Sequence, residues 1–164
     1  MNRLLIKNIN IINEGIRTSG DIFIEGEFIK KIGVDLTFDN EIKIIDGNGL
    51  IAIPGMIDDQ VHFREPGLTH KGDISSESKA AIAGGVTSYF EMPNTFPNTT
   101  SRKEFKKKIQ IASKNSFANF SFMFGGTNDN IDEIKKLDNK EVAGIKLFLG
   151  SSTGKMLIDS EDSI

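Results

Sequence analysis

Hydrophobic and polar positions divide the chain into two regions with different periodicity. Up to residue 53, short runs rich in isoleucine and phenylalanine alternate with turn signals that contain glycine. The predicted strands cover residues 4–6, 9–12, 21–24, 28–32 and 42–45, and the turn signals lie at 14–15, 19–20, 25–26 and 46–47. The pattern therefore predicts a small antiparallel β segment, of β-sandwich type, over residues 1–53.

From residue 54 the pattern changes to strands that alternate with helices. Predicted strands cover residues 56–62, 86–92, 117–124 and 142–149, and predicted helices cover 74–83, 101–114 and 131–137. Ser101 and Glu104 have the S-x-x-E spacing of a capping box, which marks the start of the second helix. Alternating βα units favour a parallel sheet, either open and doubly wound or closed as a (β/α)₈ barrel. No G-x-G-x-x-G follows the first of these strands, which argues against a dinucleotide fold.

Polar side chains gather where the predicted strands end. Gln60, His62 and Arg64 alternate along the end of the first strand, so they share one face. Asn94 follows the second strand, and Lys146 lies within the fourth, on the face opposite its apolar residues. Functional groups of parallel α/β folds collect at the carboxyl ends of the strands, so these residues predict one polar site.

Composition narrows the classes of function. A formal net charge of −3, with lysines dispersed among acids, gives no general attraction to nucleic acid. No stretch approaches the roughly 20 apolar residues of a membrane span and the first residues do not form a secretory signal, so we expect no membrane contact and a cytoplasmic location. Zero cysteines exclude disulfides and thiolate metal sites. Small molecules or proteins are the expected partners.

Several motifs together resemble the dihydroorotases of the amidohydrolase superfamily. They are IPGMID at 53–58, HFREPG at 62–67, GGVT at 84–87, MPNT at 92–95 and GIKLF at 144–148. The resemblance covers essentially the whole chain and implies an α/β fold, with the N-terminal half of a TIM-type (β/α)₈ barrel over residues 54–164. It also implies a hydrolase that reversibly cyclises N-carbamoyl-L-aspartate to L-dihydroorotate in pyrimidine biosynthesis, using zinc and a metal-activated water.

The resemblance implies a role for each residue of the predicted site. His62 matches the second histidine of a metal-binding His-x-His pair, and Gln60 stands at the first, where an amide oxygen is a poorer zinc ligand than imidazole. Lys146 matches a lysine that is carbamylated in many relatives, and a carbamate there bridges two metals. One or two zinc ions are therefore expected. Arg64 and Asn94 match the pair that binds the substrate carboxylate.

The same residues also have structural interpretations. Arg64 could pair with Glu65, and Lys146 could extend its ammonium to the barrel rim or pair with Asp58. Because an ammonium buried without a partner is costly, Lys146 needs one of these arrangements.

Other polar residues carry weaker signals. A strand histidine such as His62 is commonly a core or turn residue, and Asn94, following a proline, could be a turn former. Ordinary solvated surfaces are expected for His70, Glu77, Glu91 and the lysine run 106–108.

Length sets the last constraint. A complete barrel takes roughly 250 residues, whereas the pattern gives four strands after residue 54. The resemblance implies that two more histidines and the general-base aspartate come from later strands, so no catalytic residue is assigned here. We expect an N-terminal portion that does not turn over substrate alone. Its open strand edges favour homo-oligomers or a pyrimidine-pathway enzyme partner.

Two alternative functions stay open. One is a related cyclic amidohydrolase such as a hydantoinase, dihydropyrimidinase or allantoinase, although these rings lack the carboxylate that Arg64 and Asn94 would bind. The other is a non-catalytic pseudo-dihydroorotase that lost its metal at Gln60 and acts as a scaffold.

Overall fold

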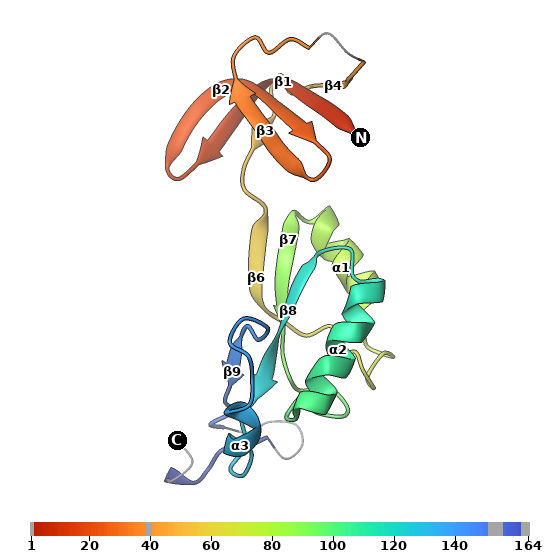
Figure 1. Ribbon diagram of the computed structural model, residues 1–164, viewed down its shortest axis with the longest axis vertical. Helices are drawn as coiled ribbons and strands as arrows, with labels where there is room; N and C mark the ends of the chain where they lie inside the picture. The colour runs from red at the N-terminus through yellow and green to blue at the C-terminus, as the bar shows by residue number, and fades with distance from the viewer. Residues whose placement is uncertain (1, 39–40, 151–155, 162–164) are drawn as a thin grey trace. The chain divides into compact units, whose positions relative to one another are not determined.

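The computed structural model describes residues 2–38, 41–150 and 156–161 (Figure 1). The chain forms two compact units, Met1–Pro54 and Gly55–Ile164. Within the described residues, no helix is long and apolar enough to cross a membrane.

The first unit is a five-stranded sheet. Its strands are β1 (Arg3–Asn13), β2 (Ile16–Glu25), β3 (Phe28–Gly33), β4 (Lys43–Asp46) and β5 (Ile51–Ala52). The first three pair as antiparallel hairpins, in the order β3-β2-β1. β4 and β5 both pair with the other edge of β1 in parallel, so the prediction of a purely antiparallel segment is wrong.

The mixed sheet has a topological cause. The chain leaves the sheet at β3, on one edge, and returns as β4 beside β1 at the other side of the β1–β2 hairpin, parallel to β1. The turn predicted at 19–20 is also wrong, because both residues lie inside β2. Gly20 is instead required by close packing: a Cβ atom there would lie 2.5 Å from the carbonyl oxygen of Gly33 on β3.

A buried aspartate organises this unit. Asp21 is 2% exposed, and its Oδ1 accepts a hydrogen bond from the backbone N–H of Asn8 at 2.9 Å. Asn8 has a φ of 58° and lies at an irregularity in the β1–β2 register. Oδ2 accepts from the N–H of Leu36 at 2.9 Å, within the segment that crosses between the sheet edges. One carboxylate therefore fixes both irregular parts of the sheet.

The second unit is a four-stranded parallel sheet with helices between the strands. Its elements are β6 (Met56–Val61), α1 (Ile74–Ala83), β7 (Val86–Glu91), α2 (Arg102–Asn115), β8 (Asn119–Gly125), α3 (Ile131–Ile134) and β9 (Gly144–Lys146). The strand order β6-β7-β8-β9 follows the sequence, and α1 and α2 lie on one side of the sheet (Figure 1). Every predicted element exists, although α3 and β9 are shorter than the pattern indicated.

Side-chain caps begin both long helices. The Oγ of Ser101 accepts from the N–H of Glu104 at 3.3 Å, which is the first half of the predicted capping box. The reciprocal pair forms instead at α1, where the Oδ1 of Asp73 accepts from the N–H of Ser76 at 2.7 Å. The Ser76 hydroxyl accepts from the Asp73 N–H at 3.4 Å, so a serine takes the place of the glutamate of the S-x-x-E motif.

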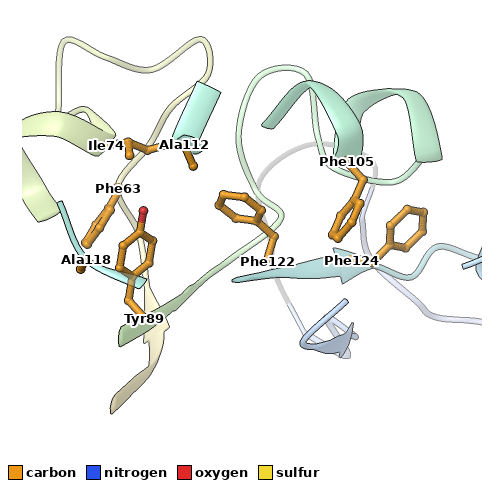
Figure 2. Close-up of a cluster of buried hydrophobic side chains, with 8 residues drawn as sticks. All are labelled: Phe63, Ile74, Tyr89, Phe105, Ala112, Ala118, Phe122 and Phe124. Carbon is orange, nitrogen blue, oxygen red and sulfur yellow. The ribbon is translucent and has the colours of Figure 1, made fainter. Parts of the chain in front are cut away.

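Aromatic side chains fill the space between the sheet and the helices (Figure 2). The rings of Phe63 and Tyr89 lie 4.5 Å apart, and Phe105 of α2 contacts Phe122 edge-on at 6.4 Å. Such aromatic pairs add stability beyond the burial of their area. Because alternate residues of β8 point toward the helices, the rest of that strand faces the opposite side of the sheet. That opposite side is where the polar residues of the predicted site gather.

We expect Asp21→Ala to destabilise the chain by about 2–4 kcal/mol, because the buried N–H of Leu36 and the part-buried N–H of Asn8 lose their acceptor. Urea denaturation measures the difference. Asp46→Ala is the matched control: its Oδ1 accepts the N–H of Asn48 at 3.0 Å on the exposed surface, and its loss should cost less than about 1 kcal/mol. Equal effects of the two substitutions would contradict the role of Asp21.

Candidate functional site

Two predicted site residues meet at the carboxyl ends of adjacent strands. His62 directly follows β6 and Asn94 lies just past β7, and the His62 Nδ1 and the Asn94 Oδ1 are 3.0 Å apart. An amide oxygen can only accept, so the imidazole donates through Nδ1 and presents the lone pair of Nε2. The Asn94 Nδ2 group keeps its two N–H donors for another partner. The pair thus offers one basic nitrogen and one amide donor side by side.

A second contact joins the two outer strands of the sheet. The Nζ of Lys146 on β9 donates to the Oε1 of Gln60 on β6 at 3.3 Å. In a flat sheet these strands would be three spacings, or about 14 Å, apart at backbone level. Side chains that meet over this distance lie on the inner face of a curled sheet, as the half-barrel requires.

Lys146 therefore has a partner, but a different one from the carboxylate considered above. Asp58 uses its Oδ1 to accept the N–H of Gln60 at 3.1 Å within its own strand. Lys146 is only half-buried, and its Nζ also lies 5.5 Å from the centre of the Phe148 ring. A fully buried ammonium would lose its hydration at a high cost in free energy. Partial exposure and the cation–π contact make that cost smaller for Lys146.

Positive charge surrounds His62. Desolvation and then the charge of Arg64 lower the pKa of this imidazole below its usual range, with smaller effects from Lys146 and Lys108. The hydrogen bond that the imidazole donates to Asn94 raises the pKa and so opposes the shift. A lowered pKa keeps the imidazole neutral at neutral pH, and Arg64 and Lys146 give the site a positive field that attracts anions.

The backbone holds Arg64 in an uncommon conformation. Its φ is 71°, in the left-handed region that residues with a Cβ atom rarely adopt. Its N–H donates to the Oε1 of Glu91, the last residue of β7, at 3.1 Å. Glu65, considered above as a partner for the guanidinium, accepts the N–H of Ile74 at the start of α1 at 2.9 Å.

A buried ion pair lies beneath these strand ends, and here the prediction of ordinary surfaces is wrong. Glu91 is 1% exposed and Lys108 of α2 is 0% exposed, and their side chains form an ion pair. The Lys108 Nζ also donates to the carbonyl oxygen of Met92 at 2.9 Å. Burial raises the pKa of Glu91 to about 7, against the opposing effect of Lys108, and burial likewise lowers the pKa of Lys108.

The sequence carried a signal for this pair. Glu91 shares its strand face with Tyr89, and Lys108 falls three residues after Phe105 and four before Ala112, both buried. Helical spacing thus places Lys108 on the core side of α2, whereas the neighbouring lysines of the run are exposed.

The loop after β6 and the loop after β7 pack tightly against each other. Gly67 has a φ of 85°, and a Cβ atom there would lie 1.9 Å from the carbonyl oxygen of Phe96. The Phe96 N–H donates to the oxygen of Pro66 at 3.0 Å. The loop after β6 and the loop after β7 are therefore held together, and only glycine fits at the crossing.

The donor set falls short of a complete zinc site. Among residues 2–38, 41–150 and 156–161, no three or more His, Asp or Glu side chains gather where they could hold a metal ion. The described part of the site offers one imidazole, one amide oxygen already bonded to Lys146, and an amine. Tetrahedral zinc sites need three or four good ligands, so these residues alone do not fit the metal.

Comparisons with known proteins agree with this geometry. The dihydro-orotase-like family matches residues 49–143. A dihydroorotase from Methanosarcina mazei is 38% identical over 158 residues, which is 96% of this chain and 34% of that protein. The multifunctional protein CAD of Squalus acanthias is 34% identical over 134 residues, covering 82% of this chain and 6% of that protein.

A solved structure gives the same result for the fold. The L-hydantoinase (dihydropyrimidinase) from Arthrobacter aurescens superposes with a TM-score of 0.90 and 28% identity, over 99% of this chain and 36% of that one. The chain thus spans about a third of the length of the Methanosarcina dihydroorotases that it matches. With the family match over residues 49–143 and the strand-end motifs in place, the chain belongs to the dihydroorotase-like family of cyclic amidohydrolases.

Proposed function

We propose that this chain forms the first part of a dihydroorotase, which cyclises N-carbamoyl-L-aspartate to L-dihydroorotate and reverses that reaction. The observation that carries the proposal is the convergence of His62, Asn94, Gln60 and Lys146 on one side of the curled sheet, within the positive field of Arg64. We refer below to the complete protein, meaning a protein of the relatives' full length that contains this chain.

Charge and donor geometry support the substrate class. N-carbamoyl-L-aspartate carries two carboxylates, and dihydroorotate retains one beside its ring. In the proposed complex, the guanidinium of Arg64 forms two parallel hydrogen bonds to that carboxylate and the Asn94 Nδ2 adds a third. The Oδ1 of Asn94 is already bonded to His62, so the amide is oriented with its N–H groups toward the ligand.

The metal is part of the proposal as well. In the complete protein, His62 would supply its Nε2 to zinc, with the remaining ligands coming from later strands. The hydrogen bond from Nδ1 to Asn94 supports this role, because metal-binding imidazoles are oriented in this way by their second nitrogen. A zinc ion held there would supply an activated water and would polarise the amide carbonyl.

Gln60 and Lys146 depart from a two-metal arrangement. The amine of Lys146 donates to the Gln60 oxygen, which gives both side chains a use without a metal. Carbamylation of Lys146 stays a prediction of the family resemblance. We propose that the complete protein holds a single zinc ion at the His62 position.

The relatives bear on the alternative functions and on possible partner proteins. The alternative of a hydantoinase or dihydropyrimidinase has a structural counterpart in the Arthrobacter aurescens protein. The Arg64–Asn94 pair favours a substrate that bears a carboxylate. Similarity to the multifunctional protein CAD is the reason to propose association with other pyrimidine-pathway enzymes. A cytoplasmic location stays a prediction. The third possibility, a scaffold without turnover, predicts a complete protein that binds no metal.

We expect Arg64→Lys to lower kcat/KM for N-carbamoyl-L-aspartate by about 10- to 100-fold in the complete protein, mainly through KM, because a lysine cannot form the two-point contact. Steady-state kinetics at saturating zinc measure it. Arg17→Lys, at an exposed position of β2, is the matched control and should leave both constants unchanged. Activity on hydantoin or dihydrouracil but not on dihydroorotate would remove the proposal in favour of the alternative.

Replacing Gln60 by histidine tests the metal arrangement. We expect the complete wild-type protein to bind about one zinc per chain and Gln60→His to bind that ion about tenfold more tightly, because an imidazole at position 60 would add a second nitrogen ligand beside His62. Elemental analysis after dialysis gives the stoichiometry, and competition with a chelator gives the affinity. His62→Asn is the control and should abolish the wild-type zinc. Equal zinc affinities of the wild type and Gln60→His would contradict a ligand position at residue 60.

A further inference from the structure

The ion pair of Glu91 and Lys108 occupies an unusual place for a buried pair. It lies directly below the substrate-binding loops, and neither side chain reaches solvent. Replacing such a pair by apolar residues commonly leaves stability unchanged or higher, so stability alone is a weak reason for its presence. Its contacts with the backbone suggest another role.

Those contacts link the ends of β6 and β7. Glu91 accepts the N–H of Arg64 at 3.1 Å, and Lys108 donates to the oxygen of Met92 at 2.9 Å. The N–H of Met92 in turn donates to the oxygen of Val61 at 3.0 Å. We call these five residues the Glu91–Lys108 network.

The network fixes the residues next to the site. Arg64 and Val61 flank the segment that carries His62, and Met92 precedes Asn94 by two residues. The backbone of Arg64 lies in the left-handed region, which costs free energy and persists only where surrounding contacts stabilise it. The hydrogen bond from the Arg64 N–H to Glu91 is one such contact. A shift at either strand end would change the distance between Arg64 and Asn94.

We propose that Glu91 is a positioning residue. Through its bond to the backbone N–H of Arg64, it sets the orientation of Arg64 relative to Asn94 for binding the substrate carboxylate, and Lys108 supplies its counter-charge. The inference rests on the proposed function for its choice of ligand. It assigns to Glu91 a role in substrate affinity that does not depend on contact with the ligand.

Two double variants isolate this role in the complete protein. Glu91→Leu with Lys108→Met removes both charges and the acceptor for the Arg64 amide. Glu91→Gln with Lys108→Met also removes both charges but keeps a side-chain oxygen in reach of that amide. Lys107→Met, on the exposed side of α2, is the single-residue control.

We expect the Leu/Met variant to raise KM for N-carbamoyl-L-aspartate about tenfold with kcat changed less than about threefold, since misplacement of a binding group weakens the complex. The Gln/Met variant should recover most of the loss, and Lys107→Met should match wild type. Equal KM values for the two double variants at similar thermal stability would overturn the proposal. An inactive wild-type protein would instead reject the proposed function.

Hydrogen exchange gives a second test that needs neither activity nor a folded variant. In the unmodified complete protein, the Arg64 amide should exchange about 100-fold more slowly than the amide of Thr69 in the exposed part of the same loop, because Glu91 holds it. Equal exchange at the two amides would show that the bond to Glu91 is not maintained in solution, and the positioning role would fall.

Discussion

The contact between the Glu91 carboxylate and the Lys108 ammonium is the interaction on which the functional end of this molecule depends. Two opposite charges inside an aromatic core are tolerated only when each also finds hydrogen bonds. Here those bonds go to backbone groups of the two loops that carry the site. The pair therefore ties the position of α2 to the shape of the loops above β6 and β7.

The site itself arises from sheet geometry. Parallel strands end on one side, so the residues that follow β6 and β7 become neighbours, as His62 and Asn94 do. Curling adds a second kind of proximity, because Gln60 and Lys146 meet across the inner face although their strands are the outermost of the sheet. The positive field around His62 is a consequence of both effects, since Arg64 follows β6 and Lys146 lies on β9.

Much of this could be predicted from the sequence, and the exceptions have physical causes. Strand and helix periods located every element of the second unit, and motif order identified the family. Pairing direction was missed in the first unit, because the parallel addition of β4 depends on a crossing segment that has no periodicity of its own. The buried pair was missed because a lysine run indicates solvent unless its helical phase is compared with that of Phe105 and Ala112.

The amide at position 60 has a consequence for how readily this site could change. Glutamine and histidine codons differ only in their third base, so a single nucleotide separates the observed residue from a metal-binding imidazole. At present the amide oxygen holds the amine of Lys146 from the far strand of the sheet. Such a mutation would remove the hydrogen-bond acceptor of the Lys146 amine and would add an imidazole that can bind a metal ion. One change at this codon would therefore alter both the environment of Lys146 and the binding of the metal.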